Sequence, residues 1–185
     1  IYYVWIGNAK KPEIFYKCLE SWKKNLPNFE IIEINEKNFD MEKHLKKNRF
    51  FRECYEKKLW AYVSDYMRVH FMYENSGIYV DTDMEIIKDL TPILEEKISF
   101  FQNQKDKISK KMEFFIGYED KKHISVGIFG TTKHNEILKE IMEFYEADIW
   151  EKPIWTIPKI FTYVFEKKYN LSEKRENILK DGEIV

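Results

Sequence analysis

The opening of the chain carries the pattern that most restricts its fold. Residues 1–6 are a β-branched and aromatic run that ends in a Gly-Asn pair, which is typical of a buried strand followed by a turn. A helical stripe follows, in which Phe15, Leu19 and Trp22 recur at helical spacing. Residues 29–34 form a second apolar run. This order predicts two parallel strands joined by a right-handed crossover helix, the first unit of an α/β sheet.

The rest of the pattern extends this unit into a mixed sheet. We expect short helices over 40–57, longer helices over 59–75, 137–145 and 158–168, and strands over 78–81, 84–87, 98–102, 112–118 and 124–129. Gly77 is placed to close the helix over 59–75 as a left-handed C-cap. Alternating helices and strands, followed by a strand-rich second half, predict an α/β fold with a mixed sheet flanked by helices, in a single domain over 1–185.

Composition and charge exclude several classes of protein. A length of 185 residues suits one domain, and 44% hydrophobic with 34% charged residues excludes a disordered tail. The 31 Lys and Arg against 32 Asp and Glu leave a formal net charge of -1, which argues against a nucleic-acid partner. Cys18 and Cys54 are too few for a disulfide framework and favour a reducing compartment, so we expect a cytoplasmic protein.

Membrane and secretion signals are weak in this sequence. The uncharged apolar stretches are far shorter than the ~20 residues of a membrane span. Lys10 and Lys11 follow the first apolar run, whereas a signal peptide carries its basic residues before it. The chain begins at Ile1 without a methionine, so we expect a processed or trimmed piece.

The strand expected over 78–81 ends in a pair of acids, Asp81 and Asp83. Alternation along an extended chain would place both carboxylates on one side, at the sheet edge where α/β proteins bind ligands. Two like charges held that close repel each other, and a hard divalent cation such as Mn²⁺ or Mg²⁺ would remove the repulsion. A solvated turn, or an acid that caps a helix, explains the same pair without a ligand.

The preceding helix adds a second charged pair. Asp65 and Arg68 share one helical face, and a core-like stripe made by Trp60, Val63, Met67 and Phe71 occupies the opposite face. One interpretation is an exposed ion pair of little energetic consequence. The other is a carboxylate for sugar hydroxyls beside a guanidinium for phosphate or sugar oxygens. Helical spacing does not separate the two.

The complete string resembles a known signature. Residues 61–68 read A-x-x-S-D-x-x-R, and residues 76–83 read S-G-x-Y-x-D-x-D. This pattern is similar to that of the DXD sugar-transferase family, which includes initiating α-mannosyltransferases, α-1,4-galactosyltransferases and bacterial capsular or oligosaccharide glycosyltransferases. It also resembles the catalytic domain of the clostridial glucosylating toxins. The run from Val4 to Gly7, with its central Trp5, is similar to the I-W-x-G element that opens these proteins.

The resemblance implies a GT-A-type, Rossmann-like fold and an enzyme. The implied reaction is metal-dependent transfer of a hexose from a nucleotide-diphosphate sugar, a UDP-sugar above all, to a saccharide acceptor with retention of configuration. It places the protein in bacterial polysaccharide, capsule or oligosaccharide synthesis, with Mn²⁺ or Mg²⁺ as cofactor. It also allows peripheral association with the inner face of a membrane.

The resemblance also assigns roles to single residues. Trp5 would stack on the nucleobase and Val4 would contact it through the backbone. Tyr79 would sit beside the nucleotide, although packing in the sheet explains this residue nearly as well. The remaining candidates concern sugar and metal: Asp65 and Arg68 would hold the donor sugar, Asp81 would contact ribose and metal, and Asp83 would ligate the metal. We therefore take Asp65, Arg68 and Asp83 as catalytic candidates.

The chain departs from the family pattern in several places. Ser76 replaces the first of two glycines, residues 125–130 lack the expected asparagine, and residues 152–158 only faintly match a later G-P-x-x-x-T element. His123 and His134 are further candidates in this half, although surface histidines are the simpler interpretation. Because the chain stops early for this family, we expect a C-terminal segment that closes over the donor to be missing.

Three alternatives stay open at this point. A nucleotidyltransferase of similar fold would carry a glycine-rich loop after the first strand, and residues 7–11 lack that glycine density. A non-catalytic carbohydrate-binding module that retains the fold would tolerate loss of a motif acid, yet all the motif acids are present. A haloacid-dehalogenase-type phosphatase needs Thr or Val where this chain has Glu85.

Overall fold

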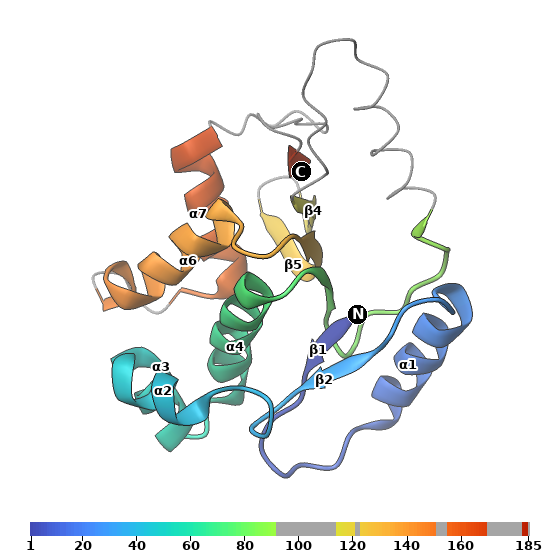
Figure 1. Cartoon of the computed structure of the whole chain (residues 1–185), viewed down its shortest axis with the longest axis horizontal. Helices are drawn as coiled ribbons and strands as arrows, with labels where there is room; N and C mark the ends of the chain where they lie inside the picture. Colours follow the sequence, from blue (N-terminus) through green and yellow to red (C-terminus); the bar gives the residue numbers. More distant parts are fainter. Residues whose placement is uncertain (92–113, 121–122, 151–154, 170–182, 185) are drawn as a thin grey trace.

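The computed structural model describes all residues except 92–113, 121–122, 151–154, 170–182 and 185. The strand expected over 98–102 lies outside the described residues. The elements, labelled as in Figure 1, are β1 (Tyr2–Val4), α1 (Glu13–Asn25), β2 (Ile32–Ile34), α2 (Met41–Lys47), α3 (Arg49–Glu56), α4 (Trp60–Glu74), β3 (Gly77–Val80), β4 (Phe114–Tyr118), β5 (Ile124–Thr131), α6 (Glu136–Glu146), a 3₁₀ turn (Asp148–Trp150), α7 (Ile157–Tyr169) and β6 (Glu183–Ile184).

The strands form one mixed sheet in the order β2–β1–β3–β5–β4–β6. β1 lies between two parallel neighbours, β2 and β3, and Tyr2 stands opposite Tyr79 in the pairing with β3. β5 runs antiparallel to both β3 and β4. Figure 1 shows α1 on one face of the sheet and α4, α6 and α7 on the other, with α2 and α3 packed beyond α4. The predicted mixed sheet flanked by helices is confirmed.

Alternate residues of the strands supply two separate hydrophobic cores. Side chains of one parity face α1, and those of the other parity face α4, α6 and α7. The α1 side includes Tyr3, Val80 and Trp22, and the opposite side includes Val4 and Tyr79. Asp81 follows Val80 and has the same parity as Tyr79. Its carboxylate therefore lies on the side of the sheet that α4 covers, where it pairs with Arg68.

The strand expected over 84–87 is wrong, because this segment is irregular. Its backbone groups bond to side chains of α1 in place of a neighbouring strand. The indole N–H of Trp22 donates to the carbonyl of Met84 at 2.7 Å, and the N–H of Ile86 donates to the hydroxyl of Ser21 at 3.0 Å. These bonds satisfy the polar backbone without a sheet ladder.

Gly77 does not cap α4 as expected. The helix ends at Glu74 with Asn75 as its C-cap, and Gly77 begins β3 with φ of 151°. A Cβ atom on Gly77 would lie 2.6 Å from the Cε2 atom of Tyr2 in the neighbouring strand. Glycine is therefore required here by the close approach of the Tyr2 ring and by the positive φ.

Among the described residues, no helix has the length and apolar character that a membrane span needs.

Candidate active site

Arg68 joins two carboxylates at the end of β3. Its Nη2 atom lies 2.9 Å from Oδ1 of Asp65, one helical turn away, and its Nη1 atom lies 3.0 Å from Oδ1 of Asp81. Nη1 also donates to the carbonyl of Val126 in β5 at 3.2 Å. Arg68 is 6% exposed and Asp65 is 9% exposed. This buried bridge excludes the interpretation of Asp65 and Arg68 as an exposed ion pair, and it places both next to Asp81.

Tyr79 supports this network from inside the core. Its hydroxyl donates to Oδ1 of Asp81 at 2.8 Å, and the guanidinium carbon of Arg68 lies 4.7 Å from the centre of its ring. The ring also stacks with that of Phe129, at 5.4 Å between centroids. Tyr79 is 1% exposed, which fits the packing interpretation. Its contact with a nucleotide stays a prediction.

Asp83 lies in a different setting from Asp81. β3 ends at Val80, and a backbone bond from the N–H of Met84 to the carbonyl of Asp81 closes a turn, so alternation along an extended chain does not apply to this pair. Asp83 is exposed, and within the described part of the chain its carboxylate accepts no hydrogen bond and forms no ion pair. Oδ2 of Asp81 also accepts no hydrogen bond from the described residues.

These free oxygens are suited to a hard divalent cation. Asp83 offers a whole carboxylate, and Asp81 offers Oδ2 on a side chain that is 29% exposed. Across the described segments, no three His, Cys, Asp or Glu side chains form a group that could hold a metal. Mg²⁺ is commonly held in proteins by one or two carboxylates, with water and substrate phosphate oxygens as the other ligands, and Asp81 and Asp83 could supply these carboxylates.

Trp5 lies at the same edge of the sheet as Asp81. It follows β1 directly, just as Asp81 follows β3, and these two strands are parallel neighbours. The backbone N–H of Trp5 donates to the carbonyl of Ile34 at 3.0 Å, and its indole N–H donates to the carbonyl of Ala9 at 3.1 Å. The indole is half-buried, whereas Val4 is 6% exposed. Stacking of a base on Trp5 stays a prediction.

Two comparisons with known proteins bear on this arrangement. Residues 12–100 match a family model described as "Glycosyltransferase sugar-binding region containing DXD motif", and this range includes Asp65, Arg68, Asp81 and Asp83. Among solved structures, one named "PaToxG Glycosyltransferase" is similar over 90% of this chain and 67% of that chain, with a TM-score of 0.67 and 16% identity. Residues 12–100 are therefore similar to the DXD sugar-binding region of glycosyltransferases, and the chain shares its fold with a solved glycosyltransferase. No curated protein matches the chain.

The GT-A-type fold prediction is thereby confirmed, and so is the prediction of an enzyme. The named subfamilies go beyond these matches, which support DXD glycosyltransferases in general. At 16% identity the structural likeness establishes the fold alone.

The surroundings of Arg68 and Asp65 shift the pKa values of both groups. Burial raises the pKa of Asp65 to about 6. The Arg68 guanidinium and the backbone N–H of Ile157 lower this pKa, whereas the Asp81 carboxylate raises it. Burial alone would lower the pKa of Arg68, but Tyr79 and the carboxylates of Asp81 and Asp65 raise it above its ordinary value. With both acids ionised, one cation faces two anions, and Asp83 adds a third negative charge at the edge. Such an excess attracts a cation.

Gly127 is a neighbour of the site that the sequence did not identify. Its carbonyl accepts the N–H of Asp81 at 2.7 Å, and a Cβ atom at this position would lie 3.5 Å from Oδ2 of Asp81. The only local signal is a glycine inside a strand, which often marks a close approach. The antiparallel register of β3 and β5 brings it there, and local patterns do not reveal that register.

His123 and His134 bond to nearby carboxylates. Nδ1 of His123 lies 2.9 Å from Oδ2 of Asp120, and Nε2 of His134 lies 3.2 Å from Oε2 of Glu74. Both imidazoles are exposed. The surface interpretation of these two histidines fits this placement.

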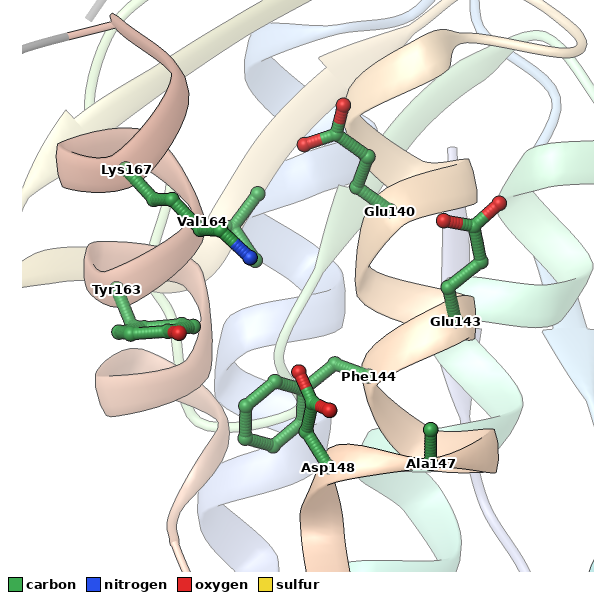
Figure 2. A pocket seen from close by; sticks show the side chains of 8 residues that line it. All are labelled: Glu140, Glu143, Phe144, Ala147, Asp148, Tyr163, Val164 and Lys167. Carbon is green, nitrogen blue, oxygen red and sulfur yellow. The ribbon is translucent and has the colours of Figure 1, made fainter.

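A separate hollow lies between α6 and α7, with a volume of about 530 Å³ (Figure 2). The described residues that line it are Glu140, Glu143, Phe144, Ala147, Asp148, Tyr163, Val164 and Lys167. None of these is a predicted donor-site residue, so the hollow and the carboxylate edge are distinct features of the protein.

Proposed function

We propose that this protein is a glycosyltransferase that moves a hexosyl group from a nucleotide-diphosphate sugar, with UDP-sugars the first candidates, to a hydroxyl of a saccharide acceptor. The observation that carries the proposal is the buried Asp65–Arg68–Asp81 bridge beside the free carboxylate of Asp83, at the edge where β1 and β3 end. A polar network of this kind at the carboxyl ends of parallel strands is typical of a ligand site. In this proposal residues 1–185 form one catalytic domain, and the reaction belongs to polysaccharide or oligosaccharide synthesis.

In this proposal the nucleotide lies along the ends of β1 and β3. Trp5 stacks on the base, with Val4 beside it through its backbone, and Tyr79 lies beside the nucleotide. A base–aromatic stack contributes about 1–3 kcal/mol. Mn²⁺ or Mg²⁺, bound by Asp81 and Asp83, would supply positive charge for the diphosphate.

The sugar lies next to Asp65 and Arg68. Asp65 accepts hydrogen bonds from sugar hydroxyls, and its ionised form is the stronger acceptor. Nη2 of Arg68 uses one hydrogen for Asp65, which leaves the other for a donor oxygen. The permanent charge of Arg68 stabilises the negative charge that develops on the departing phosphate.

The reaction breaks the bond between the anomeric carbon and the phosphate oxygen and forms a bond to the acceptor hydroxyl oxygen. The leaving phosphate takes up the acceptor's proton on the same face, which retains the anomeric configuration. The anomeric centre becomes oxocarbenium-like, as in glycoside hydrolysis. Asp65 serves as a hydroxyl anchor in this scheme and forms no covalent bond.

The free, buried thiols of Cys18 and Cys54 support a cytoplasmic location.

A screen of nucleotide sugars tests the proposal. The protein is incubated with Mn²⁺ and each UDP-, GDP-, ADP- or CDP-sugar, and the released nucleoside diphosphate is measured. We expect release from one class of donor, with UDP-sugars first. Release of pyrophosphate from nucleoside triphosphate and sugar phosphate, without nucleoside diphosphate, would identify a nucleotidyltransferase instead. Binding of sugars without any turnover would identify a carbohydrate-binding module.

A further inference from the structure

The two carboxylate oxygens of Asp81 have unequal surroundings. Oδ1 accepts the hydroxyl of Tyr79 at 2.8 Å and lies 3.0 Å from Nη1 of Arg68. Oδ2 accepts no hydrogen bond from any residue that the structure describes. Two donors on a single oxygen fix the rotation of the carboxylate about its Cβ–Cγ bond, so Oδ2 has a defined direction.

Tyr79 is placed to control this orientation from a buried position next to Asp81. It is 1% exposed, and its ring contacts both the guanidinium of Arg68 and the ring of Phe129. It also belongs to β3, the strand that ends just before Asp81, so its hydroxyl is a rigid reference point. Without that hydroxyl, the planar fork of Arg68 is free to bond both oxygens of Asp81, which is its preferred geometry with a carboxylate.

Gly127 leaves the other oxygen uncovered. A Cβ atom there would stand 3.5 Å from Oδ2 of Asp81 and 3.4 Å from Sδ of Met84. These are ordinary contact distances, so alanine fits the space, but its methyl group would cover the free oxygen. The neighbouring strand offers a matched position, because a Cβ atom on Gly117 in β4 would meet nothing within 4 Å.

We propose that Tyr79 is a positioning residue that presents Oδ2 of Asp81 to a divalent cation, and that Gly127 keeps this oxygen accessible. The inference rests on the proposed function, since the cation is the one that the nucleotide-diphosphate sugar needs. In this inference Tyr79 orients Asp81, which is a ligand of the metal. Residues that orient a metal ligand typically change metal affinity by 10–100-fold when they are removed.

The first test compares Tyr79→Phe with Tyr66→Phe. Both tyrosines are 1% exposed, and the hydroxyl of Tyr66 lies 3.0 Å from Nδ1 of His44, on the side of α4 that faces α2. Binding of Mn²⁺ in the presence of UDP is followed by the electron paramagnetic resonance signal of free Mn²⁺, alongside thermal unfolding. We expect the dissociation constant for Mn²⁺ to rise about tenfold in Tyr79→Phe and to stay unchanged in Tyr66→Phe.

Turnover provides a second readout for the same variants. For Tyr79→Phe, we expect the Mn²⁺ concentration at half-maximal rate to rise in step with the dissociation constant. Unchanged Mn²⁺ affinity in Tyr79→Phe, with a loss of thermal stability like that of Tyr66→Phe, would show a merely structural role and overturn the inference.

The second test compares Gly127→Ala with Gly117→Ala by the same Mn²⁺ titration. Weaker Mn²⁺ binding in Gly127→Ala alone, with both melting temperatures near wild type, is the expected result. Equal affinities in the two variants would contradict the role of Gly127. The outcome for the proposed function is separate: wild-type protein that binds Mn²⁺ with UDP yet releases nucleoside diphosphate from none of the donors would contradict sugar transfer and leave the positioning of Asp81 supported.

Discussion

Replacement of Arg68 by methionine removes the only cation of a buried three-residue bridge. The side chain of Arg68 is 7% exposed, and its nitrogens lie 2.9 Å from Asp65 and 3.0 Å from Asp81. Methionine fills much of the same space but leaves two carboxylates facing each other without compensation. Loss of one partner from a buried ion pair costs about 3–5 kcal/mol, and we expect Arg68→Met to lower the free energy of unfolding by that amount above neutral pH.

The cost should shrink in acid because Asp65 can take up a proton. The pKa of Asp65 is raised to about 6 by burial even with Arg68 present, and Arg68 lowers it, so the pKa is higher still in the variant. A carboxyl group with a raised folded pKa adds stability at low pH and loses that contribution as the pH rises through the folded value. The difference in stability between wild type and Arg68→Met should therefore be smaller at pH 5.5 than at pH 8.

Urea unfolding of both proteins at several pH values measures this difference. Lys23→Met is the matched control, because Lys23 pairs with Glu20 at the same i,i+3 spacing on the exposed surface of α1. We expect no measurable change in the control at any pH. A loss of less than about 1 kcal/mol in Arg68→Met, or a loss that does not vary with pH, would refute the buried bridge and the assigned protonation of Asp65.

Three further predictions concern single groups. Asp65→Asn should cost on the order of 2–4 kcal/mol in transition-state stabilisation, and the wild-type rate should rise with pH through about 6 as Asp65 ionises; a flat profile would remove Asp65 from the reaction. Trp5→Ala should raise the donor KM by the equivalent of about 1–3 kcal/mol, whereas a lower melting temperature with unchanged KM would make Trp5 a core residue. Burial lowers the pKa of His44 to about 4 and that of His70 to about 3, below the ordinary 6.5, so the free energy of unfolding should fall as the pH drops from about 6.5 to 4. In urea unfolding, His70→Phe should reduce this slope, and an unchanged slope would show that the imidazole does not contribute.

The sequence predicts those features that depend on local pattern. The apolar run over residues 1–6, the stripe of Phe15, Leu19 and Trp22, and the run over residues 29–34 are enough to predict β1, α1 and β2, because periodicity and the right-handed crossover rule act over short distances. The string over residues 61–83 brings the candidate acids together in one family pattern, and the family match includes all of it.

Other features depend on tertiary contacts that local patterns do not encode. Helical spacing leaves Arg68 either exposed or buried. Its burial follows from the packing of α4 against the sheet and α6, and Val126 in β5 accepts its hydrogen bond. Residues 84–87 have the composition of a strand, but hydrogen bonds from α1 hold them in an irregular form. Gly127 reaches Asp81 only through the pairing of β3 with β5. The metal ligand Asp83 and the stack on Trp5 stay predictions.

The central claim is metal-dependent sugar transfer that requires Asp83. It is tested most directly by measuring the release of nucleoside diphosphate before and after the metal is removed. Wild type and Asp83→Ala are treated with EDTA, and the rate with the preferred donor is measured before and after Mn²⁺ is restored. Wild type should lose its activity with EDTA and regain it with Mn²⁺. Because the carboxylate of Asp83 is exposed and without bonds among the described residues, Asp83→Ala should melt like wild type yet release nucleoside diphosphate only at the background rate. Activity of Asp83→Ala within a few-fold of wild type, at saturating donor and Mn²⁺, would contradict the account.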